Sequence, residues 1–526
     1  MSGIHTIKKR VEITRLFRIA EELSELDIKF GRLNWTKYTT GYDFGIMDIE
    51  RETQEKLKSK ESWNTIQDLL ASDLSTIDRR RADIMEIIFR PYHLSEKLSE
   101  LSLAIREKTN ELISVLNTHR CSVDGTEMTS PEISRILLSE ADRDLRRKAY
   151  LARTQVNIPL MNAGFLQLLD MRKEFAVEYG ARDFVQYQLE LQELDPAMFD
   201  SWKDEINPVL PLMREIYSGF GEEIIGDSHV MPWDITFISG NIAPELNHHV
   251  NMADFHKPIS ELFSMFGIDI AGMNITYDIF PRKNKSEWGY NFQVETGMDS
   301  RILANVRDRY FEFGVLLHET GHAVHGFTTD PKEIILNMGI SGIVSEGIAN
   351  LFGSFKWHKA FYSRFFSENL EETGKNFRRL KLWRRTNQLR SVSRILFDQA
   401  LYRNRIESID DIHQLLWKTN LEILGEQPYA DEPVWASTIH YTTHPIYFHN
   451  YLLGDLMCDM LEQTFLSREG VSDVIDRPDL FGRFILDEVV GVSGRYPFPE
   501  LFRRISGEDL SLRLLSERLI GGAAEQ

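Results

Sequence analysis

The sequence predicts a mainly α-helical protein with one small β-sheet. Over long stretches, apolar residues recur every three or four positions among Glu, Lys and Arg, as at Ile84, Ile87 and Ile88. This is the spacing of amphipathic helices. Residues 275–306 depart from it, because their apolar residues alternate with polar ones as in strands. The chain has 526 residues, of which 42% are hydrophobic, and this is enough for a large core.

Helical patterns fill the first part of the chain. Ser130-Pro131 has the composition of a helix start, Gly180 that of a helix end, and Asp195-Pro196 that of another start. Length alone suggests about three domains. We nevertheless expect one continuous unit with a helical N-terminal region, 1–230, and a second region, 231–526, whose lobes are interwoven.

Three strands are expected between the helices, at 275–280, 290–294 and 300–306, with a turn at 281–289 between the first two. They would form a small antiparallel sheet. An exposed sheet edge can bind an extended peptide as an additional strand, and Ala304 in the third strand is then a candidate peptide contact. The alternative is a purely structural hairpin.

The segment His318-Glu319-Thr320-Gly321-His322 has the pattern H-E-x-x-H. On a helix the two histidines lie one turn apart, about 40° from each other, so both imidazoles can reach one metal ion. Glu319 lies on the same flank, where it can act on a water molecule without being a ligand. The motif predicts a zinc hydrolase with His318 and His322 as ligands. The alternative is a core helix whose two histidines are satisfied by neighbours.

A hydrolytic zinc site needs a third protein ligand. Glu346 is the single acidic residue in the apolar helical segment 343–352. A buried carboxylate is costly unless it is paired or bound to metal, so we expect Glu346 to be the third ligand. Asn350, one turn further on, is a candidate to orient a ligand histidine, the alternative being a helix-packing amide.

Histidines and tyrosines gather at 438–451, where Pro445 suggests a helix start that would place Tyr447 and Tyr451 on one face. Hydroxyl and imidazole groups can stabilise an oxyanion opposite a metal. His440 and Tyr451 are the candidates for this role, and His444 and Tyr447 are candidate substrate contacts. The alternative is ordinary aromatic packing.

Composition excludes several classes of protein. The net charge of −19 argues against nucleic acid and anionic membranes as partners. Two cysteines provide no disulfide framework and fit a reducing compartment. No signal peptide and no apolar stretch of about 18 residues is present, so we expect a cytoplasmic protein. The sequence carries no indication of its oligomeric state.

The extended motif His318–His325 resembles the H-E-x-G-H-x-x-H of the thimet oligopeptidase and oligoendopeptidase F family of zinc metallopeptidases. Glu346-Gly347 resembles the family's third-ligand helix, and 440–451 resembles its H-x-x-x-x-P-F-Y-x-Y-x-Y segment. Pro232-Trp233-Asp234 is similar to an upstream family element, and Arg282 and Lys285 to a charged turn before the substrate-binding strand. The motifs agree in order over about 230–455, whereas the earlier region is similar only in being helical.

The resemblance implies two helical lobes that flank a deep channel with one zinc ion at its floor, with residues 1–230 forming much of one wall. It implies short, unstructured peptides as substrates and Glu319 as general base, assisted by His440 and Tyr451. His449 and Phe448 depart from the family pattern. A metallocarboxypeptidase or dipeptidase on the same scaffold is one alternative. A non-catalytic helical peptide-binding protein is another.

Overall fold

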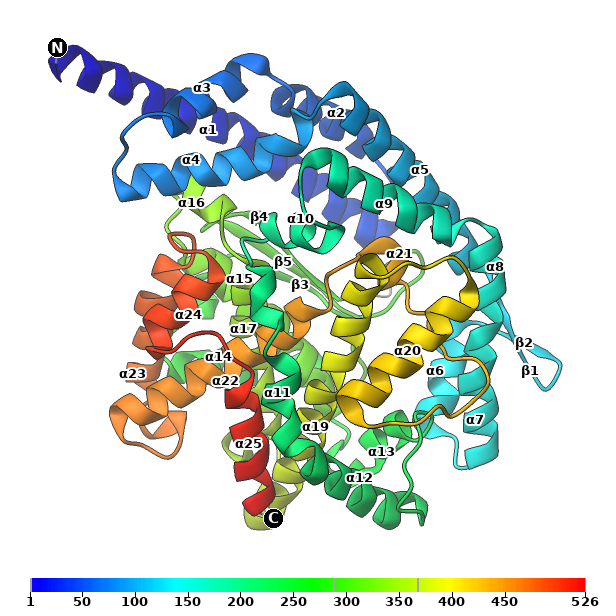
Figure 1. Ribbon diagram of the computed structural model, residues 1–526. Helices are drawn as coiled ribbons and strands as arrows, with labels where there is room; N and C mark the ends of the chain where they lie inside the picture. The colour runs from blue at the N-terminus through cyan, green and yellow to red at the C-terminus, as the bar shows by residue number, and fades with distance from the viewer. Residues whose placement is uncertain (1, 287–288, 367–368, 526) are drawn as a thin grey trace. The chain divides into compact units, whose positions relative to one another are not determined.

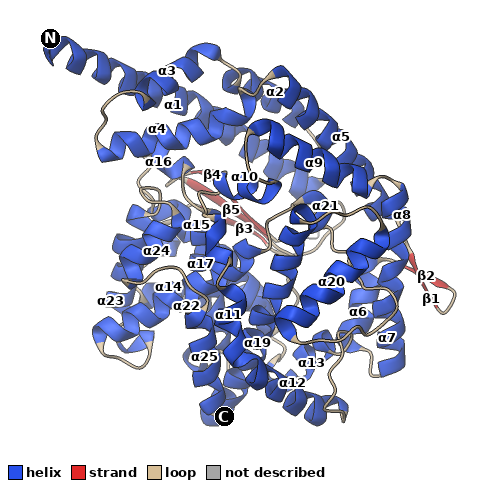
Figure 2. Ribbon diagram, in the orientation of Figure 1, coloured by secondary structure: helices blue, strands red, loops and turns tan. Residues whose placement is uncertain are grey.

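Helices make up nearly all of the regular structure (Figure 2). The computed structural model describes residues 2–286, 289–366 and 369–525. The predicted fold class, mainly α with a small sheet beside the metal-motif helix, is confirmed. No described helix combines the length and the apolar character that crossing a bilayer requires.

The chain folds into two compact units, each built from three separate segments. Unit 1 comprises Met1–Ser95, Asn247–Ser367 and Gly454–Leu510, and unit 2 comprises Glu96–Leu246, Glu368–Leu453 and Ser511–Gln526. This partition differs from the expected division at residue 230, because residues 1–95 pack with the later segment that holds the H-E-x-x-H motif. The role of 1–230 as a channel wall stays a prediction.

Unit 1 joins the N-terminal helices to the metal-motif region. Its helices, most of them labelled in Figure 1, are α1 (Ser2–Thr40), α2 (Ile46–Leu57), α3 (Lys60–Leu70), α4 (Thr76–Phe89), α14 (His256–Met265), α15 (Phe313–Thr328), α16 (Ile334–Met338), α17 (Gly342–Gly353), α18 (Lys359–Tyr362), α23 (Pro478–Arg483), α24 (Phe498–Ser506) and most of α22 (His449–Glu469). Apolar residues such as Leu16, Ile66 and Ile84 form one buried cluster with Ile335 and Leu336 of α16. This cluster fixes α16, the helix that follows α15, against the N-terminal helices.

The sheet of unit 1 contains the three predicted strands in an order that differs from the prediction. These are β3 (Ile275–Asp278), β4 (Tyr290–Glu295) and β5 (Asp299–Leu303), in the order β3-β5-β4. The β4–β5 pair is antiparallel as expected, whereas β3 pairs with β5 in parallel. The first two strands therefore do not form a hairpin, and β4 is an edge strand.

The connection between β3 and β4 explains this order. Lys285 is almost completely buried and its ammonium group donates to the carbonyls of Asp278, Phe280 and Ala304. Arg282 pairs with the Asp278 carboxylate at 2.6 Å and donates to the carbonyl of Thr39. These contacts fold the connection back against the sheet and carry the chain past β5. Glu287 and Trp288 of the predicted turn lie outside the described residues.

Unit 2 is helical apart from a short hairpin. Its elements are α5 (Glu96–Thr118), β1 (Cys121–Val123), β2 (Thr126–Met128), α6 (Ser130–Ser139), α7 (Arg143–Ala152), α8 (Asn157–Asn162), α9 (Phe165–Tyr179), α10 (Phe184–Glu190), α11 (Trp202–Ile206), α12 (Leu210–Ile225), α13 (Ile235–Asn241), α19 (Leu370–Arg403), α20 (Ile409–Leu424), α21 (His440–Thr443) and α25 (Arg513–Ala524). Helix α6 begins one residue earlier than expected, with Thr129 as its N-cap. Gly180 ends α9 in a left-handed conformation, as predicted.

Asp234 anchors α13 within unit 2. Its carboxylate is fully buried and binds two guanidinium groups, that of Arg146 at 2.9 Å and that of Arg143 at 2.7 Å. It also accepts the backbone N–H of Met231. The Pro-Trp-Asp element thus has a structural role, because it ties α13 to α7.

Candidate metal centre

Two closely packed helices of unit 1, α15 and α17, carry the three candidate metal ligands. Helix α15 presents His318 and His322, and α17 presents Glu346. The helices approach closely because Gly321 faces α17: a Cβ atom at Gly321 would lie 2.9 Å from the Cα of Ala349. Glycine at this position therefore brings the carboxylate within reach of the imidazoles.

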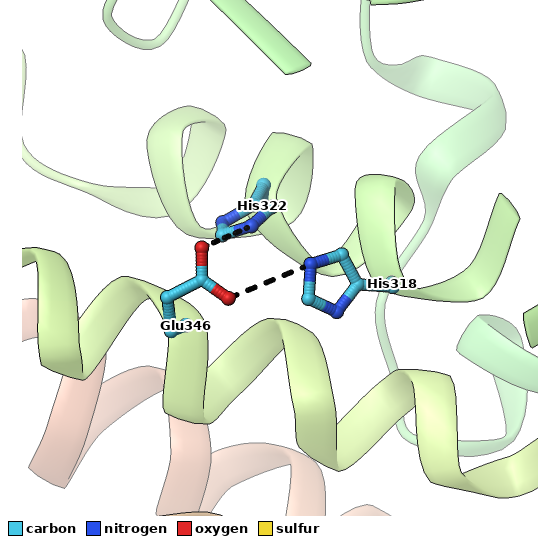
Figure 3. Close-up of side chains that lie close together, drawn as sticks. All are labelled: His318, His322 and Glu346. Carbon is cyan, nitrogen blue, oxygen red and sulfur yellow. Dashed lines mark ion pairs between the residues drawn. The ribbon is translucent and has the colours of Figure 1, made fainter. Parts of the chain in front are cut away.

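The three side chains converge on one point (Figure 3). Glu346 lies 3.7 Å from Nε2 of His318 through one oxygen and 3.6 Å from Nε2 of His322 through the other. One ligand atom from each residue can be chosen so that all three lie within 4.8 Å of one another. Ligands about 2.1 Å from a tetrahedral zinc ion are separated by roughly 3.4 Å. The spacing therefore fits a metal ion better than a directly hydrogen-bonded cluster.

The chemistry of this donor set fits zinc. Two imidazoles and one carboxylate form a ligand set of catalytic zinc sites, which leave one position open. The side chains remain 25%, 16% and 34% exposed for His318, His322 and Glu346, so one side of the cluster is accessible. Burial, together with His318 and His325, lowers the pKa of His322 to about 3, which keeps its imidazole neutral, as a metal ligand requires.

Ser345 orients one of the ligands. Its hydroxyl lies 2.9 Å from Nδ1 of His322, which leaves Nε2 directed towards Glu346. A hydrogen bond at the second ring nitrogen fixes the tautomer of a ligand histidine. The sequence analysis missed this residue. The one indication in the sequence was that Ser345 directly precedes the candidate ligand Glu346 on the same helix.

Asn350 differs from its expected role as the partner of a ligand histidine. Its amide donates to the carboxylate of Asp455 at 3.2 Å. Asp455 in turn acts on Glu346: burial first, and then the charge of Asp455, raises the pKa of Glu346. Asn350 is therefore connected to the cluster through Asp455, which is more than 100 positions later in the chain.

Glu319 lies between the metal cluster and the sheet. Its carboxylate is buried and accepts the backbone N–H of Asn291, a residue of edge strand β4. Burial, followed by the charge of Glu346, raises the pKa of Glu319 to about 8. The carboxylate is thus a stronger base than an ordinary glutamate.

The third histidine of the extended motif is not part of the cluster. His325 is buried and its Nε2 lies 3.1 Å from the hydroxyl of Ser493, which donates to the carbonyl of Val490. Burial lowers its pKa to about 4. His325 therefore connects α15 to the segment that follows α23.

Unit 2 brings together the predicted residues of the histidine-tyrosine segment. Nε2 of His440 lies 3.3 Å from the hydroxyl of Tyr451, and the Tyr447 and Tyr451 rings are 5.5 Å apart. Burial lowers the pKa of His440, with smaller contributions from the charges of His444 and Arg394. His444 is exposed, with Nδ1 2.7 Å from the hydroxyl of Thr443. Tyr451 and Tyr447 are partly exposed, so their hydroxyl-bearing rings are accessible.

The loop before α22 differs from the predicted helix start at Pro445, because α22 begins at His449. Ile446 adopts a left-handed backbone with φ of 56°, which is rare for a β-branched residue. Its N–H donates to the buried carboxylate of Asp398 at 2.8 Å. Asp398, missed in the sequence, therefore holds this loop. In the sequence it is the one acid in the mostly apolar stretch 395–402 of α19, a helix that elsewhere carries many charged residues.

His449 is buried, and its Nε2 lies 3.0 Å from the amide oxygen of Gln192. Burial lowers its pKa to about 3. This side chain is therefore a packing element of unit 2.

Comparison with known proteins identifies a shared fold. No protein-family model matches the chain, and no curated protein matches its sequence. Among solved structures the chain is similar to Pz peptidase A, solved with an inhibitor. The TM-score is 0.68 at 15% sequence identity, and the match covers 99% of this chain and 97% of that one. At this level of identity the likeness shows the fold. It extends through residues 1–230, where no sequence motif indicated a similarity.

Ala304, a candidate peptide contact, uses its backbone groups within the protein, and its role towards a peptide stays a prediction. Its N–H donates to the carbonyl of Asp278 at 2.9 Å, and its carbonyl accepts the ammonium group of Lys285. Both backbone groups are therefore occupied, and the strand that precedes it, β5, is central in the sheet. The edge strands of this sheet are β3 and β4.

Proposed function

We propose that the chain is a zinc-dependent oligopeptidase that hydrolyses internal peptide bonds of short, unstructured peptides. The observation that carries the proposal is the position of Glu319. Its buried carboxylate lies beside a two-histidine, one-glutamate cluster and is hydrogen-bonded to edge strand β4. A base, a metal-ligand set and a strand edge able to hold a peptide thus occur together.

His318, His322 and Glu346 would hold the zinc ion. When bound, zinc supplies a Lewis acid and makes a water molecule acidic enough to react near neutral pH. Glu319 accepts the proton of the attacking water and passes it to the leaving amine. Its raised pKa suits a group that takes up a proton and then releases it.

The remaining roles in the proposal concern substrate binding and stabilisation of the oxyanion. An extended peptide adds to the free edge of β4 through backbone hydrogen bonds, which favours unfolded chains over folded proteins. His440 and Tyr451 serve as hydrogen-bond donors to the oxyanion, and His444 and Tyr447 contact the substrate. The pairing of His440 with Tyr451 and the accessibility of Tyr447 support these roles.

Glu319→Gln tests the proposal. The variant should retain about one zinc ion per chain and lose peptide hydrolysis by at least roughly 10²-fold, because the amide cannot accept the proton. Glu312→Gln is the matched control: this half-buried carboxylate lies just before α15 and outside the cluster, so turnover should be unchanged. A wild-type chain that binds no zinc, or full activity in Glu319→Gln, would contradict the proposal.

An exopeptidase on the same scaffold is the second candidate. An internally quenched peptide with both termini blocked separates the two, because only an endopeptidase cleaves it. A structural zinc site is disfavoured, since such sites have four closed ligands and the described residues offer only three for this group.

A further inference from the structure

A second site is built into unit 2, outside the residues assigned to hydrolysis. It is a cavity of about 350 Å³ whose lining includes Arg153, Arg390, Arg394, Tyr429, Thr438 and Tyr441. The residues come from α19, α20 and the segments around α7, α13 and α21, the last in orange and α20 in yellow in Figure 1. Cavities of this volume accommodate small organic ligands.

Two of the three arginines at this cavity are not neutralised by the protein. Arg390 pairs with Glu426, with one N–O distance of 2.6 Å. Arg153 and Arg394, in contrast, form no hydrogen bond or ion pair with any residue in the described part of the chain. Their guanidinium groups lie over ring faces instead, Arg153 over Tyr150 at 5.7 Å and Arg394 over Phe448 at 5.3 Å.

Arginines without a carboxylate partner are unexpected in a chain that carries an excess of carboxylates. With a net charge of −19, carboxylates are in excess over lysine and arginine. Two arginines without a carboxylate beside one cavity therefore create a local positive potential. A guanidinium group presents a fork of N–H donors that fits carboxylate and phosphate oxygens.

Further donors and an apolar wall complete the site. Tyr441 is buried, and its hydroxyl forms no hydrogen bond within the described residues. Leu416, Leu424 and Val434 line another part of the cavity. The lining therefore suits a ligand with a negatively charged head and an apolar or aromatic body.

We propose that this cavity binds a small organic oxyanion. A phosphate or carboxylate group is held by Arg153 and Arg394, and the body of the ligand packs against Leu416 and Tyr429. The cavity lies next to His440 in the chain. Its lining includes Tyr441, which directly follows His440, and Thr438, which precedes His440 by two positions. The ring of Phe448, beneath Arg394, also lies 4.6 Å from the ring of His440. A bound oxyanion would therefore restrain the residues around His440.

Isothermal titration of the full chain at constant ionic strength tests the proposal. The probes are phenyl phosphate, benzoate and, as a neutral analogue, benzyl alcohol. We expect saturable binding of one anion per chain and no binding of benzyl alcohol. The anion that binds with the higher affinity, phenyl phosphate or benzoate, identifies the preferred head group. The measurement requires no peptide hydrolysis, so its failure would leave the proposed peptidase function intact.

Two variants locate the binding. Arg153→Gln combined with Arg394→Gln should weaken the preferred anion by roughly tenfold or more, because charge-assisted hydrogen bonds are lost. The control combines Arg147→Gln with Arg405→Gln, which removes the same charge from side chains that are 50% and 84% exposed and do not line the cavity. The control should bind as the wild type does.

Ser391→Leu provides an independent test that leaves the charges in place. Ser391 lines the cavity, and the larger side chain should reduce the affinity for phenyl phosphate by occupying part of the volume. Circular dichroism confirms that each variant is folded. The proposal is overturned if the wild type binds neither anion, if the control pair loses binding as strongly as the cavity pair, or if the folded cavity variants bind unchanged.

Discussion

Replacing Gly321 by alanine should separate the two helices that carry the metal ligands. The added Cβ would lie 2.9 Å from the Cα of Ala349 and 3.2 Å from a ring carbon of Phe352. Carbon atoms in contact are normally about 3.5–4.0 Å apart, so α15 and α17 must move apart by roughly 0.6 Å or more. Overpacking of this kind typically costs about 1–3 kcal/mol.

The same displacement acts on the metal cluster. Glu346 lies on α17 and already sits 3.6–3.7 Å from the two imidazole nitrogens on α15. If the displacement is opposed by a bound metal ion, the strain of about 1–3 kcal/mol appears as a loss of zinc affinity of roughly 5- to 150-fold. The apparent Tm of the zinc-free chain should also fall.

Competition for zinc with a chromogenic chelator measures the first effect, and scanning calorimetry measures the second. Gly342→Ala is the matched control, because it lies in α17 and an added Cβ meets no atom within 4 Å. Zinc affinity and Tm values of Gly321→Ala equal to those of the control would show that the close approach of the helices does not position the ligands.

Three further predictions address individual residues. Ser345→Ala should weaken zinc binding by roughly 10- to 100-fold, because His322 loses the hydroxyl at Nδ1; chelator competition measures this, and unchanged affinity would exclude an orienting role. His449 has a pKa of about 3 when folded, against an ordinary value of 6.5. The unfolded chain therefore takes up its proton first, and stability is lost as pH falls below 6.5. Lowering the pH from 7 to 5 should cost about 2 kcal/mol through this residue. His449→Gln should remove that share of the difference between urea midpoints at the two pH values, and an unaltered pH dependence would refute the assignment. Asp234→Ala should destabilise the protein by about 3–5 kcal/mol, because Arg146 is left buried without its carboxylate. Chemical denaturation measures the change, and a loss below about 1 kcal/mol would show that the pair contributes little.

The strands were predictable from alternation, but their pairing order was not. Alternation depends only on which residues face the core, and β3, β4 and β5 lie where it indicated. Pairing of consecutive strands is enforced only by short hairpin loops of about 2–5 residues. The connection 279–289 is longer, and the burial of Lys285 beneath three carbonyls gives it a path past β5.

The convergence of His318, His322 and Glu346 was predictable because the signals of these residues are local. Two histidines at helical spacing and one acid in an apolar helix each follow from a few neighbouring residues. The hydrogen-bond partners of Asn350 and Ala304 were not predictable, because they are distant in sequence or depend on the order of the strands in the sheet. Asp455, for example, follows Asn350 by more than 100 positions, and no local pattern connects the two. Local chemistry therefore predicted this three-residue cluster better than the contacts of the residues around it.

The three-segment construction of each unit determines the order in which the protein can fold during synthesis. Domains made of one contiguous segment can fold while later residues are still being translated. Unit 1 must wait for residues up to Leu510. Unit 2 must wait for α25, which packs on α19 and α11 and begins beside Glu205, whose carboxylate accepts the N–H of Leu512 and the hydroxyl of Ser511. Unit 1 is therefore completed only after residue 510 has been translated and unit 2 only after α25, and the nascent chain exposes unfinished cores until then.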